Sequence, residues 1–198
     1  MQMIRPHLIL IVAAVLFAAG PAAAHTEAGV PGGLLSGFLH PLSGWDHLVA
    51  MVAVGLWGAQ LGRPGIWVLP VCFPAVMAIG GVLGVLGVSL PATELVIALS
   101  ALVLGLAVAM SLRLPFWAAA VVVGVFAAFH GYAHGREMPG ASNALAYGVG
   151  FVCATGMLHA AGILFGTLIR WPAGAWAVRA VGVAIAGLGG VFLLSMPA

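Results

Sequence analysis

The sequence predicts an all-α protein, a polytopic membrane helix bundle with six transmembrane helices after a cleaved signal peptide. Composition is the first reason, because 64% of the 198 residues are hydrophobic and 5% are charged, against about 25% charged residues in a soluble domain. The mean hydropathy of +1.23 agrees with this. The second reason is spacing, because the apolar residues form successive segments of about 20 residues, the length that crosses a bilayer as a helix.

Residues 1–24 have the pattern of a secretory signal peptide. A positively charged start leads into a short apolar run at 8–19, and a triplet of alanines precedes His25. This order of regions is typical of a segment that is removed during export. Cleavage after Ala24 would make His25 the mature N-terminus, outside the cytoplasm. An uncleaved first transmembrane helix is the alternative. We expect residues 25–198 to form a single six-helix transmembrane domain.

Six apolar segments follow the signal, and a shorter apolar stretch at 33–39 precedes the first of them. Each segment has roughly the 20 residues that a bilayer requires. The connectors are short and contain proline and glycine, and proline is well tolerated in the first turn of a helix. The predicted spans are residues 43–61, 66–88, 92–112, 116–134, 143–169 and 176–196.

The arginines predict how these spans are oriented. If the mature N-terminus is outside, the first, third and fifth spans end inside, and cytoplasmic loops carry an excess of basic residues. Four arginines then lie at the cytoplasmic face, namely Arg63, Arg113, Arg170 and Arg179, while Arg136 lies outside. The signal peptide and the arginines therefore agree. We expect a multi-pass protein of the cell inner membrane with both mature termini on the periplasmic side.

Ionisable side chains gather in two short segments. The first holds His40, Asp46 and His47, and the second holds His130, His134 and Glu137. Under the predicted topology both segments lie at the outer face. Placing a charge at the centre of a bilayer costs about 2.5 to 3.5 kcal/mol on insertion scales, so groups kept there are usually paired or bound to something. Imidazole and carboxylate together suit nickel, cobalt or zinc.

Spacing within the segments suggests how they would bind an ion. His130 and His134 are four residues apart, so both project from one helix face. A structural hydrogen-bonded pair is the alternative. His47 and Asp46 are adjacent and point in different directions, so one could bind the ion while the other orients a neighbouring imidazole. Asp46 could instead accept from backbone N–H groups in the first helical turn.

The chain before the first span is expected to bend. His40 precedes Pro41, which favours an extended backbone at His40. On one straight helix, His40 and His47 would be roughly 10 Å apart and could not share an ion. A re-entrant bend, helped by Gly44, would bring the two imidazoles together.

Four further residues are candidates with equally good structural explanations. Glu137 is either an entrance carboxylate or the partner of Arg136 in a loop. Glu94 begins the third span, where it compensates the helix dipole or attracts cations. His159, deep in the fifth span, is either a second station for an ion moving inward or a core histidine bonded to a carbonyl group. If cleavage follows Ala24, the α-amine and ring of His25 could chelate an ion together.

Both motifs resemble the HupE/UreJ family. The first is His40-Pro41-x-x-Gly44-x-Asp46-His47, and the second is Phe129-His130-Gly131-x-Ala133-His134-Gly135-x-Glu137. The resemblance runs over essentially the whole mature chain. The family is regarded as nickel permeases, sometimes cobalt permeases, linked to hydrogenase or urease maturation. The resemblance implies that the transport positions are His40, Asp46, His47, His130, His134 and Glu137.

We therefore expect a secondary permease that imports nickel or cobalt for metalloenzyme maturation, and not an enzyme. The metal is cargo, so no permanently bound cofactor is expected. The partners are the divalent ion, the lipid bilayer and hydrogenase or urease maturation proteins. Six basic residues against four acidic ones give no surface for nucleic acid. Small residues at helical spacing leave a homo-oligomer as an alternative to packing within one chain.

Two other functions stay open at this stage. A membrane-embedded zinc hydrolase could use three histidines, an aspartate and a serine such as Ser43 around a catalytic metal. A haem-binding membrane subunit could use paired axial histidines. The residue types do not separate nickel from cobalt or zinc, because all three accept imidazole and carboxylate.

Overall fold

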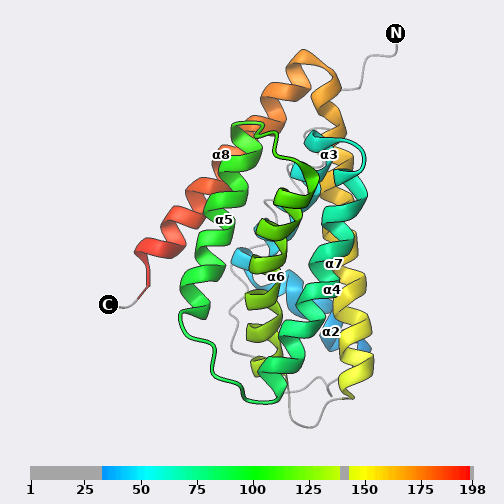
Figure 1. Cartoon of the computed structure of the whole chain (residues 1–198), viewed down its shortest axis with the longest axis vertical. Coiled ribbons are helices and arrows are strands. Elements are labelled where there is room, and N and C mark those ends of the chain that lie inside the picture. Colours follow the sequence, from blue (N-terminus) through cyan, green and yellow to red (C-terminus); the bar gives the residue numbers. More distant parts are fainter. Residues whose placement is uncertain (1–32, 139–142, 197–198) are drawn as a thin grey trace.

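The computed structural model describes residues 33–138 and 143–196, and every regular element within this part is helical (Figure 1). The predicted all-α class is therefore confirmed for the described residues. The predicted signal peptide and His25 lie outside them. The elements are α2 (Leu34–Ser43), α3 (Trp45–Leu61), α4 (Gly65–Val85), α5 (Thr93–Ala109), α6 (Phe116–Glu137), α7 (Ala144–Gly166), the 3₁₀ helix η1 (Thr167–Arg170) and α8 (Pro172–Leu194).

Helix α3 lies at the centre of the bundle. It contacts every other described α-helix, and all its residues from 49 to 58 are buried. This stretch is apolar throughout, as expected of a helix enclosed on all sides. The outer helices instead carry large apolar side chains on their exposed faces, such as Trp67 on α4, Leu164 on α7 and Val191 on α8. An apolar exterior around an apolar core identifies a multi-pass membrane protein.

Four helices are long and apolar enough to cross a membrane, namely α4, α6, α7 continued by η1, and α8. Helices α3 and α5 have 17 residues each. At 1.5 Å per residue such a helix extends about 25 Å, slightly less than the roughly 30 Å hydrocarbon core. Protein surrounds α3, so α3 does not have to match the thickness of the lipid. The full set of six spans stays a prediction.

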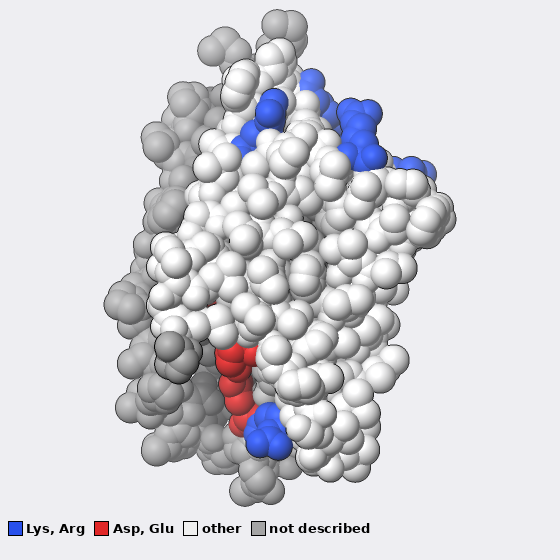
Figure 2. Space-filling model, turned by 60° about the vertical axis from the view of Figure 1, so that its left-hand side comes forward, with Lys and Arg blue, Asp and Glu red and all other residues white. Residues whose placement is uncertain are grey.

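Charged side chains separate toward opposite ends of the bundle. Arg63, Arg113 and Arg170 lie in the connections after α3, α5 and α7, which come together at one end (Figure 1). Arg179 joins them, because its Nε–H donates to the Ala109 carbonyl at the end of α5 (2.8 Å). Figure 2 shows basic side chains at that end and acidic ones toward the other, beside a basic group. The fold has the predicted separation of charge, while the side that each end faces stays a prediction.

Helices α4 and α6 pack closely because glycines line their contact. Gly80 and Gly84 of α4 lie against the α6 backbone, while Gly131 and Gly135 of α6 lie against the α4 backbone. A β-carbon at Gly131 would collide with the Met77 carbonyl. Each of the two α6 glycines directly follows a histidine, so the contact that fixes α6 against α4 also fixes the direction of both imidazoles.

Candidate metal-ion site

The first histidine segment is divided between two helices that meet at Gly44. The backbone of Gly44 is extended (φ −101°, ψ 118°), which ends α2 and begins α3. The predicted bend is therefore present. The extended backbone predicted at His40 is wrong, because His40 and Pro41 both lie inside α2. Packing overrides the local preference: Gly37 lies against the Tyr147 carbonyl and anchors α2 on α7.

Glu137 brings His40 and His134 together. The Nε2 atom of His40 lies 3.1 Å from Glu137 Oε2, and His134 Nδ1 lies 3.7 Å from the same oxygen. The candidate ligand atoms of these three residues all lie within 4.8 Å of one another. Among the described residues, the ion-pair partners of Glu137 are these histidines and not Arg136. Two imidazoles and a carboxylate at this spacing can surround one divalent ion after small side-chain movements.

Four imidazoles form a continuous row that descends from this triad into the bundle. Ring centroids are 4.8 Å apart for His40 and His134, 4.2 Å for His134 and His47, and 4.9 Å for His47 and His130. The His40 side chain is 21% exposed, whereas His130 is completely buried. The predicted convergence of the two segments is therefore present, across α2, α3 and α6.

Asp46 supports His47 instead of joining the triad. Its Oδ1 accepts the backbone N–H of His47 at 3.0 Å, and its Oδ2 lies 3.6 Å from His47 Nε2. The carboxylate also sits in the first turn of α3, where the positive end of the helix favours it. Asp46 therefore accepts from a backbone N–H group in the first turn of α3, which is one of the two roles predicted for it. A direct bond from Asp46 to an ion stays a prediction.

Two buried histidines have a defined tautomer. The Nδ1 of His130 lies 2.9 Å from the Phe126 carbonyl, and the Nδ1 of His159 lies 2.8 Å from the Met51 carbonyl. A carbonyl oxygen can only accept, so each Nδ1 carries the proton and each Nε2 presents a lone pair. Neither Nε2 has a hydrogen-bond partner among the described residues. A neutral imidazole held at Nδ1 is the form that binds a metal ion through Nε2.

A cavity of about 530 Å³ opens beside the triad, at the acidic end of the bundle. Its lining includes Glu94, at the start of α5, together with Arg136 and Glu137. Two carboxylates in one cavity attract a cation, and Glu137 belongs to both the cavity and the triad. Glu94 can therefore fulfil both roles considered from the sequence, as a residue of the first helical turn and as part of an entrance.

Comparison with known proteins agrees with the two motifs. The family model described as HupE / UreJ protein matches residues 12–192. The chain belongs to the HupE/UreJ family. It is 46% identical to Protein HupE of Rhizobium leguminosarum bv. viciae over 175 residues. This matched region covers 88% of the present chain and 92% of that protein. No solved structure matches the chain. The family resemblance inferred from the sequence is confirmed.

One residue of this HupE/UreJ site had no sequence signal. Phe73 of α4 is fully buried, and its ring centroid lies 5.6 Å from that of His130 and 5.3 Å from that of His159. A phenylalanine within a uniformly apolar span looks like any other core residue. Its position beside both histidines becomes evident only when α4 is packed against α6 and α7.

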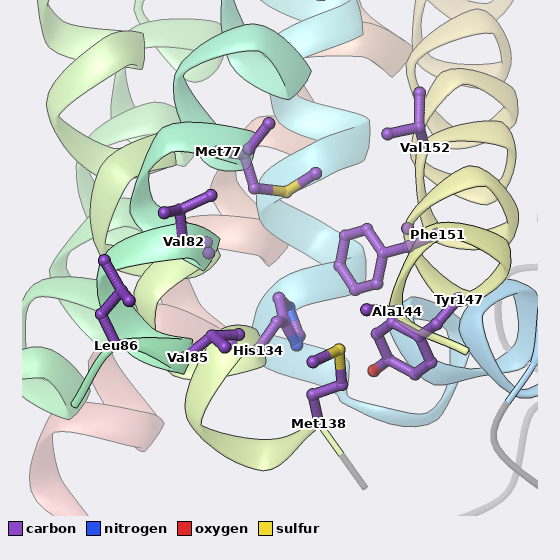
Figure 3. Close-up of a pocket in the computed structure, with 15 residues that line it drawn as sticks. Met77, Val82, Val85, Leu86, His134, Met138, Ala144, Tyr147, Phe151 and Val152 are labelled. Atoms are coloured by element: carbon purple, nitrogen blue, oxygen red, sulfur yellow. The ribbon is translucent and has the colours of Figure 1, made fainter. Parts of the chain in front are cut away.

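A second cavity, of about 360 Å³, lies between α4, α6 and α7. Figure 3 shows His134 at its edge, among apolar side chains that include Met77, Phe151 and Val152. The Phe151 ring packs against the His134 ring, with 4.4 Å between centroids. The lining on this side is mostly apolar and includes no carboxylate, in contrast to the cavity that contains Glu94 and Glu137.

Proposed function

We propose that this HupE/UreJ protein is a secondary permease that imports a divalent metal ion, nickel or cobalt, across the cell inner membrane. The observation that supports this most strongly is the row of imidazoles, which begins at a half-exposed carboxylate and ends at a fully buried ring. A purely structural histidine cluster has no need to extend from the surface into the core. A transported ion does, because it must exchange its hydration shell for protein ligands step by step.

The geometry suggests an order of events. The cavity that contains Glu94 and Glu137 attracts the hydrated dication by charge. His40, His134 and Glu137 then replace part of its water, and His47 with His130 carry it deeper. At each step the ion exchanges one or two of its ligands, and the imidazole that it leaves is already in contact with the imidazole that it reaches. A membrane potential, negative inside, favours the entry of a dication by roughly 4.6 kcal/mol per 100 mV, so no nucleotide is required.

The choice of ion rests on the family and not on the ligand set. Imidazole and carboxylate accept nickel, cobalt and zinc alike. Membership of HupE/UreJ supports nickel, or cobalt, and a supply to hydrogenase or urease maturation proteins. The proposal includes cleavage of the signal peptide after Ala24 and a topology in which the triad of His40, His134 and Glu137 faces the periplasm.

The geometry weakens the two alternatives. A hydrolase that uses Ser43 needs its hydroxyl directed at a base, but Ser43 Oγ donates to the His40 carbonyl at 2.6 Å. A haem subunit needs space for a macrocycle between two axial rings. The ring centroids of His47 and His130 are 4.9 Å apart, and this close contact leaves no room for one.

Uptake of radioactive nickel by cells that lack their own importers tests the proposal. Cells with the protein should accumulate nickel, and His134→Ala at a matched membrane level should not. The matched control is Val121→Ala, on the exposed face of the same helix, which should transport like the wild type. No uptake above background by correctly inserted protein would contradict the proposal. Excess unlabelled cobalt or zinc can then be added as a competitor, and the extent to which each lowers the uptake of radioactive nickel ranks the ions.

A further inference from the structure

We propose that His159 and Thr155 of α7 form a second, inner metal-ion station, which Phe73 separates from the outer histidine row. The inference rests on the proposed permease function and deepens it by adding a site on the way inward. At 1.5 Å per residue, His159 lies about 22 Å from the first residue of α7. Its ring bonds to the Met51 carbonyl of α3, one helical turn farther from the start of α3 than His47, so His159 lies deeper than the outer histidine row.

His159 has the form that an ion-binding histidine requires. It is 1% exposed, its Nδ1–H donates to the Met51 carbonyl of α3, and its Nε2 has no hydrogen-bond partner in the described part of the chain. Burying an acceptor without a partner costs about 1 to 3 kcal/mol. A purely structural role is complete with the Met51 bond and does not account for the second nitrogen.

Thr155 is the residue one helical turn before His159, so both side chains lie on the same face of α7. Its side chain is fully buried. Buried hydroxyl groups on helices usually bond to a carbonyl of the preceding turn, as the buried Ser100 does to Ile97 in this protein. Thr155 Oγ1 has no hydrogen-bond partner among the described residues. Two unsatisfied buried acceptors thus share one face.

Phe73 defines the boundary between the stations. Its ring makes an edge contact with the rings of both His130 and His159, at interplanar angles of 64° and 79°, and no ring contact joins His130 to His159 directly among the described residues. The outer row therefore ends and the inner station begins at the same ring. A cation that passes the face of an aromatic ring is stabilised by it. Phe73 separates two binding positions without placing a repulsive charge between them.

The two stations differ in charge, and this difference suits transport inward. The outer triad contains the carboxylate of Glu137, which captures a dication from dilute solution. The inner pair contributes one imidazole nitrogen and one hydroxyl oxygen, both neutral. A neutral set holds a dication less tightly than one with a carboxylate. The inner station therefore passes the ion on toward release, so its loss should lower the maximal rate of uptake. The outer triad captures the ion and should determine the apparent KM.

Three substitutions test the inner station by nickel uptake at matched membrane levels. His159→Asn can still donate to the Met51 carbonyl through its amide but lacks the imidazole lone pair. Thr155→Val has the shape of threonine without the hydroxyl, and Thr155→Ser retains the hydroxyl. We expect His159→Asn to lower the maximal rate about tenfold or more with an unchanged apparent KM. Thr155→Val should lower the rate in the same way, and Thr155→Ser should not.

The outcomes separate this inference from the permease proposal. Wild-type rates in His159→Asn and Thr155→Val, with His134→Ala inactive, would overturn the inner station and leave the permease intact. No uptake by the wild type would overturn the permease itself. Binding of nickel to purified protein, measured by equilibrium dialysis, provides a second readout. His159→Asn should bind nickel at the outer triad like the wild type, and a loss of that binding would show a structural role instead.

Discussion

Glu137 Oε2 lies 3.1 Å from His40 Nε2, across 97 positions of sequence. This contact joins the end of α6 to α2 and closes the exposed end of the site. Because α2 is fixed on α7 and α6 is fixed on α4, the bond links two parts of the bundle that meet at the histidine row. The same oxygen is near His134, so one carboxylate organises both imidazoles.

The charge of Glu137 should determine capture of the ion. Glu137→Gln retains the shape of the side chain and one acceptor oxygen but removes the charge. We expect the apparent KM for nickel uptake to rise about tenfold or more, because a neutral amide neither attracts nor binds a dication well. Arg136→Gln is the matched control, since it neutralises the neighbouring side chain. Its uptake should not fall, and equal losses in both variants would contradict a specific role for Glu137.

His47 and His130 should act in series. Either alanine substitution interrupts the row between the triad and the interior, so each should abolish uptake. The double variant should be no worse than either single variant, because residues that act as one unit are strongly non-additive. Initial uptake rates measure this. If the single variants retain some uptake, and the loss in the double variant equals the product of the two single losses, the two residues act independently. That result would contradict one shared path.

Gly44 should be required for the position of the first segment. A β-carbon there would lie 2.9 Å from Asp46 Oδ1 and 3.0 Å from His47 Cδ2. Gly44→Ala should therefore displace both side chains and reduce uptake while the protein stays folded, because its backbone angles suit alanine. Gly156→Ala is the control, since a β-carbon at Gly156 meets nothing within 4 Å. Uptake assays and detergent melting curves of both variants test this.

The close contact of α4 with α6 should contribute measurably to stability. Gly131→Ala places a methyl group against the Met77 carbonyl, and overpacking of this kind costs about 1 to 3 kcal/mol. We expect a lower midpoint of thermal denaturation in detergent. Gly124→Ala, on the same helix, would meet Cys72 Sγ at 3.7 Å, an ordinary contact. An equal effect of the two substitutions would show that close backbone approach is not what fixes α6.

Much of the site was predictable from local chemistry. The four-residue spacing of His130 and His134 determines a shared helix face, and arginine positions determine which ends of the spans lie together. These two inferences are enough to bring the histidine segments to one end. The bend at Gly44 followed from the distance between His40 and His47 on a straight helix.

Other features depend on packing that no local pattern records. The helical backbone at His40 results from the contact of α2 with α7, which overrides the preference of a residue before proline. Phe73 and Thr155 look like ordinary residues of apolar spans. The position of Phe73 beside His130 and His159 arises only from the way α4 packs against α6 and α7, whereas Thr155 shares a helix face with His159 through spacing alone and owes only its burial to packing.

Nickel entry into sealed vesicles that contain only the purified protein and lipid tests the central claim most directly. A metal-sensitive dye inside the vesicles reports arrival of the ion, with an imposed potential that is negative inside. The account predicts entry in wild-type vesicles, entry in Val121→Ala vesicles, and none above the protein-free background with His134→Ala. Entry that persists in His134→Ala, or is absent from correctly inserted wild-type protein, would contradict a permease that works through this row of histidines.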